Sequence, residues 1–342
     1  MKFFKSKTNI VFSIITIVLT IAVAFLGFTV WQQKTRYVQA SSNLTDNEAQ
    51  LVEAESRIAE ITAQLEEYSQ KSDADEAEKE RLNSELQAAI AEKDRLSQEN
   101  ANLKGQIEQL RTERRERLKQ EIALNNVVQA PSAESGICYL TFDDGPSDNT
   151  LAVMDILDSY GIKGTFFVAS TSKNAYLSQM NARGHAIGLH TATHSYSQIY
   201  SSIENYLADL KLISDIVYSY TGIRSNIMRF PGGSSNKVSA SYCQGIMTEL
   251  TTLMPTLGYS YYDWNVSSGD ASGQNVPAST ITSNVLNGAR GKNSICVLMH
   301  DTSAKGTTVQ ALPDIIEGLH AMGFRFAPLT AEVYGFHQTV IN

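Results

Sequence analysis

Cysteine is scarce in this sequence, and basic residues do not outnumber acidic ones. The chain of 342 residues has three cysteines, Cys138, Cys243 and Cys296, too few for a disulfide framework. Cys138 and Cys296 lie in apolar runs, where a buried free thiol is the default expectation. One disulfide bond between two of the three cysteines is compatible with the sequence, but nothing in the sequence supports it. The formal net charge of −8 argues against a nucleic-acid-binding protein.

Charge is also absent from one long segment near the N-terminus, residues 10–31. At about 1.5 Å per residue, a helix of this length crosses the ~30 Å hydrocarbon core of a membrane. The lysines that precede it favour a cytoplasmic N-terminus. We therefore expect a cytoplasmic tail (1–9), a single-pass anchor in the cell membrane (10–31) and the rest of the chain outside the cell. A signal peptide cleaved after Ala40 is the alternative.

Proline is absent between residues 44 and 124, and glycine occurs there once. Glu, Lys, Gln, Arg, Ala and Leu dominate this segment. One heptad frame places apolar residues at most a and d positions, which predicts a coiled coil. Asn100 falls at an a position and favours a parallel two-stranded coil, hence a possible homodimer.

Three consecutive polar residues, Ser72, Asp75 and Lys79, interrupt this seam. They mark either a weak point in one continuous rod or the bend of an antiparallel helical hairpin. Because neither proline nor glycine breaks the helix there, we predict a single long coiled-coil helix over 44–124. The segment 125–136 is then predicted to be a linker.

The remaining residues, 137–342, alternate short apolar runs with amphipathic stretches. Seven runs have the character of buried strands: 137–142, 165–169, 186–190, 227–230, 259–264, 294–299 and 324–328. Residues 202–220 form the clearest helical pattern. This alternation predicts a parallel α/β sheet, open or closed into a barrel, with its chemistry at the carboxyl ends of the strands.

Two adjacent carboxylates, Asp143 and Asp144, follow the first of these runs. The third run ends in GHAIGLHTATH, where His190 and His194 are four residues apart, a spacing that places both imidazoles on one face of a helical turn. Two histidines and one carboxylate are a common ligand set for Zn²⁺. We predict that one aspartate binds a metal while the other accepts a proton from water. An ordinary Asp-Asp-Gly-Pro turn is the simpler alternative.

Three further strand ends carry groups suited to catalysis. MRFPGG contains Arg229, whose guanidinium can hold an aspartate ionised, and glycines whose N–H groups can approach an oxyanion. YYDWNVSSGD contains Trp264 and Asp270, and VLMHD contains His300, a candidate general acid. Each has an ordinary structural explanation, but their occurrence at successive strand ends favours a single site.

With these residues in view, the C-terminal part of the chain resembles the polysaccharide deacetylases of carbohydrate esterase family 4. The resemblance rests on five motifs in order: TFDDG, HTATH, RFPGG, DWNVSSGD and LMH. It implies a distorted (β/α) barrel of about seven strands that binds one divalent metal, with Zn²⁺ the first candidate. Such enzymes remove acetyl groups from N-acetylated sugars.

The resemblance also implies a role for each motif residue. The metal ligands would be Asp144, His190 and His194. The catalytic residues would be Asp143 as general base, His300 as general acid, Arg229 orienting Asp143, and Asp270 tuning His300. The substrate-binding residues would be Trp264 and Leu298 in the acetyl pocket, with Phe230, Gly232 and Gly233 in the adjoining loop.

Two motifs depart from the family pattern. Where many members have Arg-Pro-Pro-Tyr-Gly, Phe230 and Gly232 replace the first proline and the tyrosine. A backbone N–H survives as an oxyanion donor, but the contacts of that tyrosine are lost. Ser267 and Ala271 replace an aspartate and a tryptophan of the fourth motif and open the groove. Neither change touches the metal ligands.

These features together predict a membrane-anchored, metal-dependent N-deacetylase acting outside the cell. Peptidoglycan N-acetylglucosamine is the first candidate substrate, ahead of chitin-like oligomers, an exopolysaccharide or acetyl-xylan. The hypothesis from a different class is a non-catalytic glycan-binding or scaffolding protein of the cell envelope, in which the coiled coil recruits partners.

Overall fold

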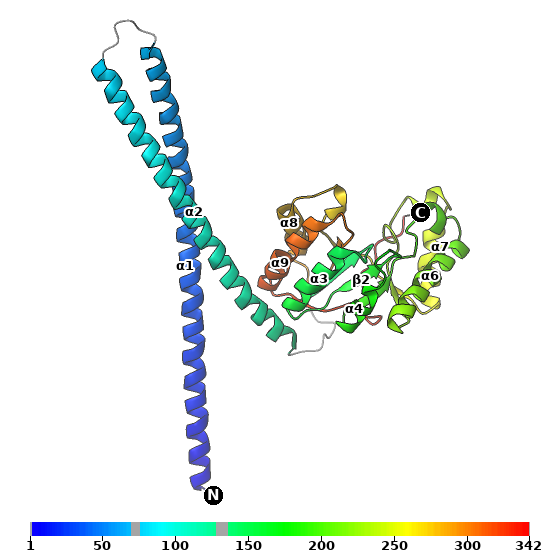
Figure 1. Cartoon of the computed structure of the whole chain (residues 1–342). Helices are drawn as coiled ribbons and strands as arrows, with labels where there is room; N and C mark the ends of the chain where they lie inside the picture. The colour runs from blue at the N-terminus through cyan, green and yellow to red at the C-terminus, as the bar shows by residue number, and fades with distance from the viewer. Residues whose placement is uncertain (1, 70–75, 128–135, 342) are drawn as a thin grey trace. The chain divides into compact units, whose positions relative to one another are not determined.

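The computed structural model describes residues 2–69, 76–127 and 136–341, with side chains for 31–69, 76–121 and 136–341. The chain divides into two compact units, Met1–Arg117 and Leu118–Asn342. Each unit is treated separately below (Figure 1).

The first unit is built from helix α1 (Lys2–Ser69) and most of helix α2 (Glu76–Val127), which lie side by side in Figure 1. Two apolar clusters join them, one around Ile61, Leu82 and Ala89 and one around Ala40, Leu103 and Ile107. Ion pairs between Arg57 and Glu85 (2.5 Å) and between Lys104 and Glu48 (3.1 Å) accompany this packing. Because late residues of α1 meet early residues of α2, the helices are antiparallel.

The prediction of one continuous coiled-coil helix is therefore wrong, and the hairpin alternative is correct. The two helices end and begin on either side of residues 70–75, which lie outside the described part of the chain. The seam that suggested a parallel homodimer is buried within one chain: Asn100, for example, is only 5 % exposed. A polar interruption of a heptad seam is enough to end a helix when the returning helix can bury the same apolar stripe.

No helix is long and apolar enough to cross a membrane in the part of the chain whose side chains are described. The predicted anchor at 10–31 lies, apart from Trp31, outside that part. The anchor therefore stays a prediction.

The second unit contains one sheet in which every described strand pair is parallel. Its strands are β1 (Ile137–Asp143), β2 (Thr165–Val168), β3 (Ala186–Leu189), β4 (Ile227–Met228), β5 (Ser260–Tyr261), β6 (Val266–Ser267), β7 (Ser294–His300) and β8 (Arg325–Phe326). The order is β5-β4-β3-β2-β1-β7-β6, with β8 beside the start of β1. No described pairing joins β5 to β6, so the sheet is an open, curled half-barrel.

All seven predicted strands are present, several of them shortened. The remaining strand, β6, was missed because it has only two residues, one position beyond the predicted strand 259–264, and so few residues show no alternating pattern. The helices are α3 (Asp148–Ser159), α4 (Tyr176–Ala182), α5 (Tyr196–Ile199), α6 (Ile203–Thr221), α7 (Ile246–Thr256), α8 (Ala278–Ala289) and α9 (Gly306–Ala321). Helix α6 matches the predicted 202–220: the Ser202 hydroxyl accepts the Asn205 N–H, and Gly222 ends the helix at a φ of 73°.

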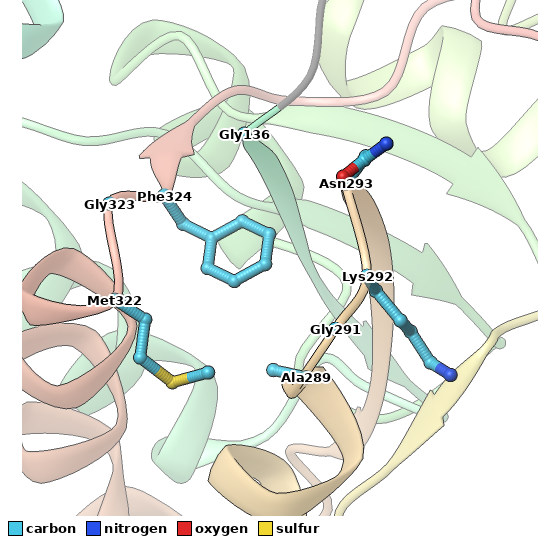
Figure 2. Close-up of a pocket in the computed structure, with 8 residues that line it drawn as sticks. All are labelled: Gly136, Ala289, Gly291, Lys292, Asn293, Met322, Gly323 and Phe324. Atoms are coloured by element: carbon cyan, nitrogen blue, oxygen red, sulfur yellow. The ribbon is translucent and has the colours of Figure 1, made fainter.

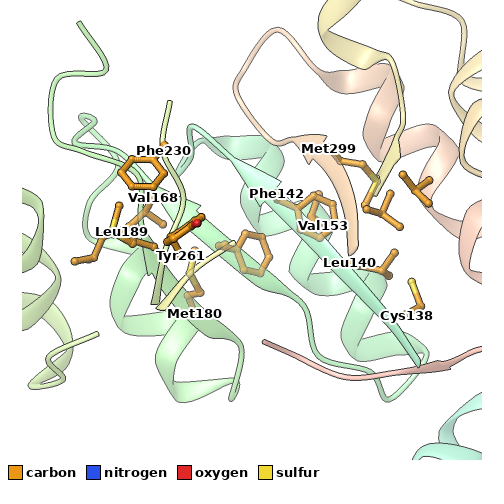
Figure 3. Packing of buried hydrophobic residues seen from close by; sticks show 14 of the residues in the cluster. Cys138, Leu140, Phe142, Val153, Val168, Met180, Leu189, Phe230, Tyr261 and Met299 are labelled. Atoms are coloured by element: carbon orange, nitrogen blue, oxygen red, sulfur yellow. The ribbon is translucent and has the colours of Figure 1, made fainter. Parts of the chain in front are cut away.

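Strand β1 is buried along its whole length, as expected for a central parallel strand covered on both faces. Leu140 and Phe142 point into the larger cluster, part of which Figure 3 shows, while Ile137 and Tyr139 point into a second cluster on the other face. All three cysteines are free, and Cys138 and Cys296 are buried as expected. The central position of β1 delivers its last residue, Asp143, to the middle of the carboxyl edge of the sheet.

Candidate active site

The candidate residues meet because parallel strands end at one edge of the sheet. Asp143 and His300 are the last residues of β1 and β7 and pair directly in register. His190 directly follows β3, and Arg229 directly follows β4. Asp144 continues from β1 over the same edge. Five residues that are up to 157 positions apart in the sequence thus share one site, as the strand-end argument predicted.

Three of these residues form a cluster suited to a metal ion. The ligand atoms of Asp144, His190 and His194 all lie within 4.8 Å of one another. The Nε2 atoms of the two histidines are each 3.3 Å from Oδ1 of Asp144. Burial opposes ionisation of Asp144, but the adjacent histidines hold the pKa of this carboxyl well below its usual range. The carboxylate is therefore available as a ligand.

The hydrogen bonds around this cluster fit a divalent cation. Nδ1 of His190 lies 2.8 Å from the carbonyl oxygen of Arg229. A carbonyl only accepts, so Nδ1 carries the proton and the lone pair of Nε2 faces Asp144. Oδ1 of Asp144 is buried without a hydrogen-bond partner among the described residues. Two lone pairs that face each other repel, and a cation such as Zn²⁺ between them satisfies both.

The turn that carries the two histidines is not the helical turn that their spacing predicted. Residues 190–195 are not helical, and the two imidazole centroids are 5.2 Å apart. Thr191 and His194 have positive φ angles of 66° and 53°, and Asp144 has one of 71°. Non-glycine residues adopt this conformation only when their surroundings impose it. The pairing of the histidines therefore comes from tertiary contacts.

Asp209 of α6 supplies those contacts, and the sequence analysis missed it. Its carboxylate accepts the N–H groups of Ala192 and Thr193, the latter at 3.1 Å, and the Thr193 hydroxyl at 2.8 Å. These hydrogen bonds resemble those by which an aspartate caps a helix end, and they hold the backbone of the turn in place. An aspartate on the polar side of an amphipathic helix carries no local signal that could have revealed this role.

Arg229 is fully buried beneath Asp143 and is not the surface ion pair of the simpler explanation. Its Nη1 donates to Oδ1 of Asp143 and to the Thr141 hydroxyl, both at 2.7 Å. Its Nε and Nη2 donate to the carbonyls of Tyr262 (2.8 Å) and Asp263 (3.0 Å). A guanidinium held at four points gives Asp143 a fixed, charged hydrogen-bond donor. The arrangement orients the Asp143 carboxylate and suits it to act as a base.

His300 is held by Asp270 on the opposite side of β1. The carboxylate accepts the ring Nδ1–H at 2.9 Å and the backbone N–H of His300 at 2.8 Å. The Thr308 hydroxyl also donates to it, at 3.0 Å. Burial lowers the pKa of His300, but the hydrogen bond to Asp270 and the nearby charge of Asp143 outweigh burial and raise the pKa to about 9. The imidazole is therefore charged at neutral pH and can donate a proton.

Of the predicted substrate-binding residues, Trp264 lies beside Arg229, with 5.8 Å between the guanidinium carbon and the ring centroid, and Gly233 lies beside Trp264. Gly232 and Gly233 have positive φ angles of 78° and 79°, and a Cβ on Gly233 would lie 3.0 Å from the Trp264 ring. Leu298 lies on β7 opposite Thr141 and is 9 % exposed. Phe230 is fully buried and packs among tyrosine rings. Its side chain is therefore part of the core beneath the glycine loop 232–233 and is not exposed to a substrate.

Two buried aspartates near the site were also missed. The carboxylate of Asp263 accepts the N–H groups of Ser234 (2.7 Å) and Gln338 (2.8 Å), and so ties the glycine loop to the C-terminal segment. Asp301 donates its N–H to the Asp143 carbonyl at 3.3 Å, and burial raises the pKa of its carboxyl to about 7. Asp263 directly precedes Trp264 in the sequence, and Asp301 directly follows His300. This proximity to predicted site residues was the only signal that could have identified them.

A cavity of about 350 Å³ lies at the opposite, amino-terminal end of β1 and β7. Lys292, Asn293, Met322 and Phe324 are among its lining residues (Figure 2). It contains none of the candidate residues. The candidate residues lie at the other end of these strands, at the carboxyl edge of the sheet.

Known proteins with related sequences place this arrangement in a family. The family model described as polysaccharide deacetylase matches residues 131–245. YheN of Bacillus subtilis, designated a polysaccharide deacetylase, is 31% identical over 206 residues, which cover 58% of this chain and 69% of YheN. A peptidoglycan-N-acetylglucosamine deacetylase of Bacillus cereus is 29% identical over 208 residues, covering 58% of this chain and 72% of that protein.

Solved structures agree with the sequence relatives. The catalytic domain of peptidoglycan N-acetylglucosamine deacetylase from Eubacterium rectale is 40% identical, with a TM-score of 0.59, and the match covers 63% of this chain and 99% of that domain. The polysaccharide deacetylase Bc1974 from Bacillus cereus is 28% identical, with a TM-score of 0.51, over 58% of this chain and 94% of that protein.

Proposed function

This chain belongs to the polysaccharide deacetylase family, and on that premise we propose that it is a metal-dependent N-deacetylase of peptidoglycan N-acetylglucosamine. One observation carries the proposal. The cluster of Asp144, His190 and His194 lies beside Asp143, which a buried arginine holds, and Asp143 pairs in register with His300, which a buried aspartate holds. A cluster of metal ligands with a general base and a general acid nearby is suited to hydrolysing an amide.

The residues divide the reaction between them. A divalent metal held by the cluster would polarise the acetyl carbonyl and acidify water. Asp143, oriented by Arg229, takes a proton from the attacking water as the new C–O bond forms. The N–H of the loop at Gly232 stabilises the oxyanion. His300 gives its proton to the sugar nitrogen as the C–N bond breaks, and acetate and a free amine are released.

The choice of substrate rests on relatives of this chain. The Bacillus cereus and Eubacterium rectale proteins both carry peptidoglycan N-acetylglucosamine deacetylase in their names. A chitin deacetylase of Colletotrichum lindemuthianum is 29% identical, and the bifunctional xylanase/deacetylase of Pseudobutyrivibrio xylanivorans is 30% identical. Chitin-like oligomers and acetyl-xylan are therefore the substrates against which peptidoglycan must be compared.

The location belongs to the same proposal. Residues 10–31 would anchor the chain in the cell membrane with the N-terminus in the cytoplasm, and the catalytic unit would act outside the cell. The uncharged length of this segment supports the anchor. An envelope polymer is a substrate that a tethered enzyme can reach without being released.

The test measures acetate release by the full-length protein in detergent from peptidoglycan, chitin oligomers and acetyl-xylan. We expect release that requires added Zn²⁺ and is lost with a chelator and in Asp143→Asn. Asp94→Asn, an exposed change on α2, is the matched control and should behave as the parent protein. Metal binding and glycan binding without release from any polymer would refute the enzyme and favour the glycan-binding scaffold.

A further inference from the structure

The space beside Gly232 is filled by a tyrosine from another part of the chain. A Cβ on Gly232 would collide with the Tyr196 hydroxyl oxygen and would lie 3.4 Å from Cζ of the same ring. Tyr196 is the first residue of α5 and stands two residues after His194. The phenol therefore reaches the glycine loop from the metal-binding side of the site.

The Tyr196 ring is held between two neighbours. It packs edge-on against the His194 imidazole, with centroids 5.7 Å apart, and against Tyr200, with centroids 5.4 Å apart. The Tyr200 hydroxyl in turn donates to the carbonyl of Pro231 at 2.7 Å, so α5 is tied to the same loop. These contacts fix the direction of the Tyr196 hydroxyl relative to both the candidate metal ligand and Gly232.

The hydroxyl itself is available to a ligand. Within the described residues, no protein group makes a hydrogen bond with it, although the buried hydroxyls of Tyr200 and Tyr262 both donate to backbone carbonyls. Tyr196 is partly exposed, and its hydroxyl oxygen lies beside Gly232 of the glycine loop. A fixed donor beside a backbone N–H and a metal cluster is positioned for an oxygen that gains negative charge.

We propose that Tyr196 is a catalytic residue whose hydroxyl donates a hydrogen bond to the acetyl oxygen of the substrate in the transition state. This inference rests on the proposed deacetylase function. No proton is transferred: Tyr196 stays neutral and adds a second donor beside the N–H of the Gly232 loop. Gly232 is then required for two reasons, because its φ is 78° and because a side chain there would displace Tyr196.

The primary experiment compares the full-length protein with Tyr196→Phe, which removes only the hydroxyl. We expect kcat on N-acetylglucosamine oligomers to fall roughly tenfold to a hundredfold, with KM and Zn²⁺ affinity changed less than about twofold. Tyr220→Phe, at an exposed tyrosine of α6, is the matched control and should leave kcat unchanged. An unchanged kcat in Tyr196→Phe, or a change confined to KM, would overturn the inference.

A mutant cycle tests the contact with Gly232 independently. Gly232→Ala should lower kcat in the parent protein by displacing Tyr196 and by strain at the positive φ. In a Tyr196→Ala background, the same change should cost clearly less, because the collision is gone. Fully additive effects would show that the two residues do not act together and would contradict the inference.

Failure of the proposed function is distinguishable from failure of this inference. If the parent protein releases no acetate, the deacetylase proposal fails. The role of Tyr196 in catalysis then fails with it. If the parent protein releases acetate and Tyr196→Phe releases it at the same rate, the deacetylase proposal stands and only the inference about Tyr196 fails.

Discussion

The helical hairpin and the sheet unit both use ion pairs, but they use them in opposite ways. In the hairpin, Arg81 pairs with Glu78 one turn away, and the two side chains are 60% and 33% exposed. In the sheet unit, Arg229 and Asp143 are 86 residues apart in the sequence, and their side chains are 0% and 4% exposed. Exposed local pairs contribute little to stability, whereas breaking a buried pair leaves an uncompensated charge. The first kind solubilises a helix, and the second kind fixes a site.

The largest effect should separate these two pairs. Arg229→Ala leaves Asp143 buried without its donor, so we expect the sheet unit to lose about 3–5 kcal/mol of stability and all measurable deacetylation. Arg81→Ala should leave both the unfolding curve and activity unchanged. Urea unfolding followed by near-ultraviolet circular dichroism, which reports on tertiary packing, measures the difference. A similar loss of stability in both variants would show that the buried pair contributes no more to stability than the exposed pair.

The second effect compares two aspartates of the same helix, α6. Asp209 holds the turn that carries His190 and His194, whereas Asp215 makes exposed pairs with Lys211 and Arg224. Asp209→Ala should weaken Zn²⁺ binding about tenfold to a hundredfold, because partners behind the ligands orient them. Asp215→Ala should leave the affinity unchanged. Competition with a chromophoric chelator gives both dissociation constants, and equal values would refute the positioning role of Asp209.

The smallest effect concerns pH. His300 must be protonated to act as an acid, and its pKa is raised to about 9, so activity should persist at neutral pH and decline as pH rises through that value. Asp270→Asn removes the carboxylate that stabilises the charged ring, so the alkaline limb of the profile should move to lower pH. Activity at pH 8 should then fall roughly tenfold or more. The profile of kcat/KM against pH checks this shift, and an unmoved alkaline limb would show that Asp270 does not tune His300.

Much of the site was predictable because its motifs lie at strand ends. TFDDG ends β1, HTATH follows β3, RFPGG follows β4 and LMH ends β7, so parallel pairing alone predicts their convergence. The strand pattern predicted seven of the eight strands for the same reason: each apolar run is local. The two residues of β6 are too few for a period, and only pairing with β7 makes them a strand.

Other features could not be predicted from local patterns. The heptad pattern of 44–124 is compatible with a rod and with a hairpin, because either arrangement buries the same apolar stripe. Phe230 was assigned to the substrate by its motif, yet packing among Tyr206 and Tyr261 buries it. In both cases the result depended on which distant segment packs against the residue or helix, and local sequence patterns do not specify that segment.

The sequence by itself determined which chemical groups this protein has and at which strand ends they stand. Only the tertiary structure decided how those groups are held. Asp209 imposes the turn on the two candidate metal-binding histidines, Arg229 contacts Asp143 from another strand, and Tyr196 occupies the space that Gly232 leaves open. The physical reason is that composition and spacing record short-range preferences, whereas burial and strain are imposed by residues far away in the chain.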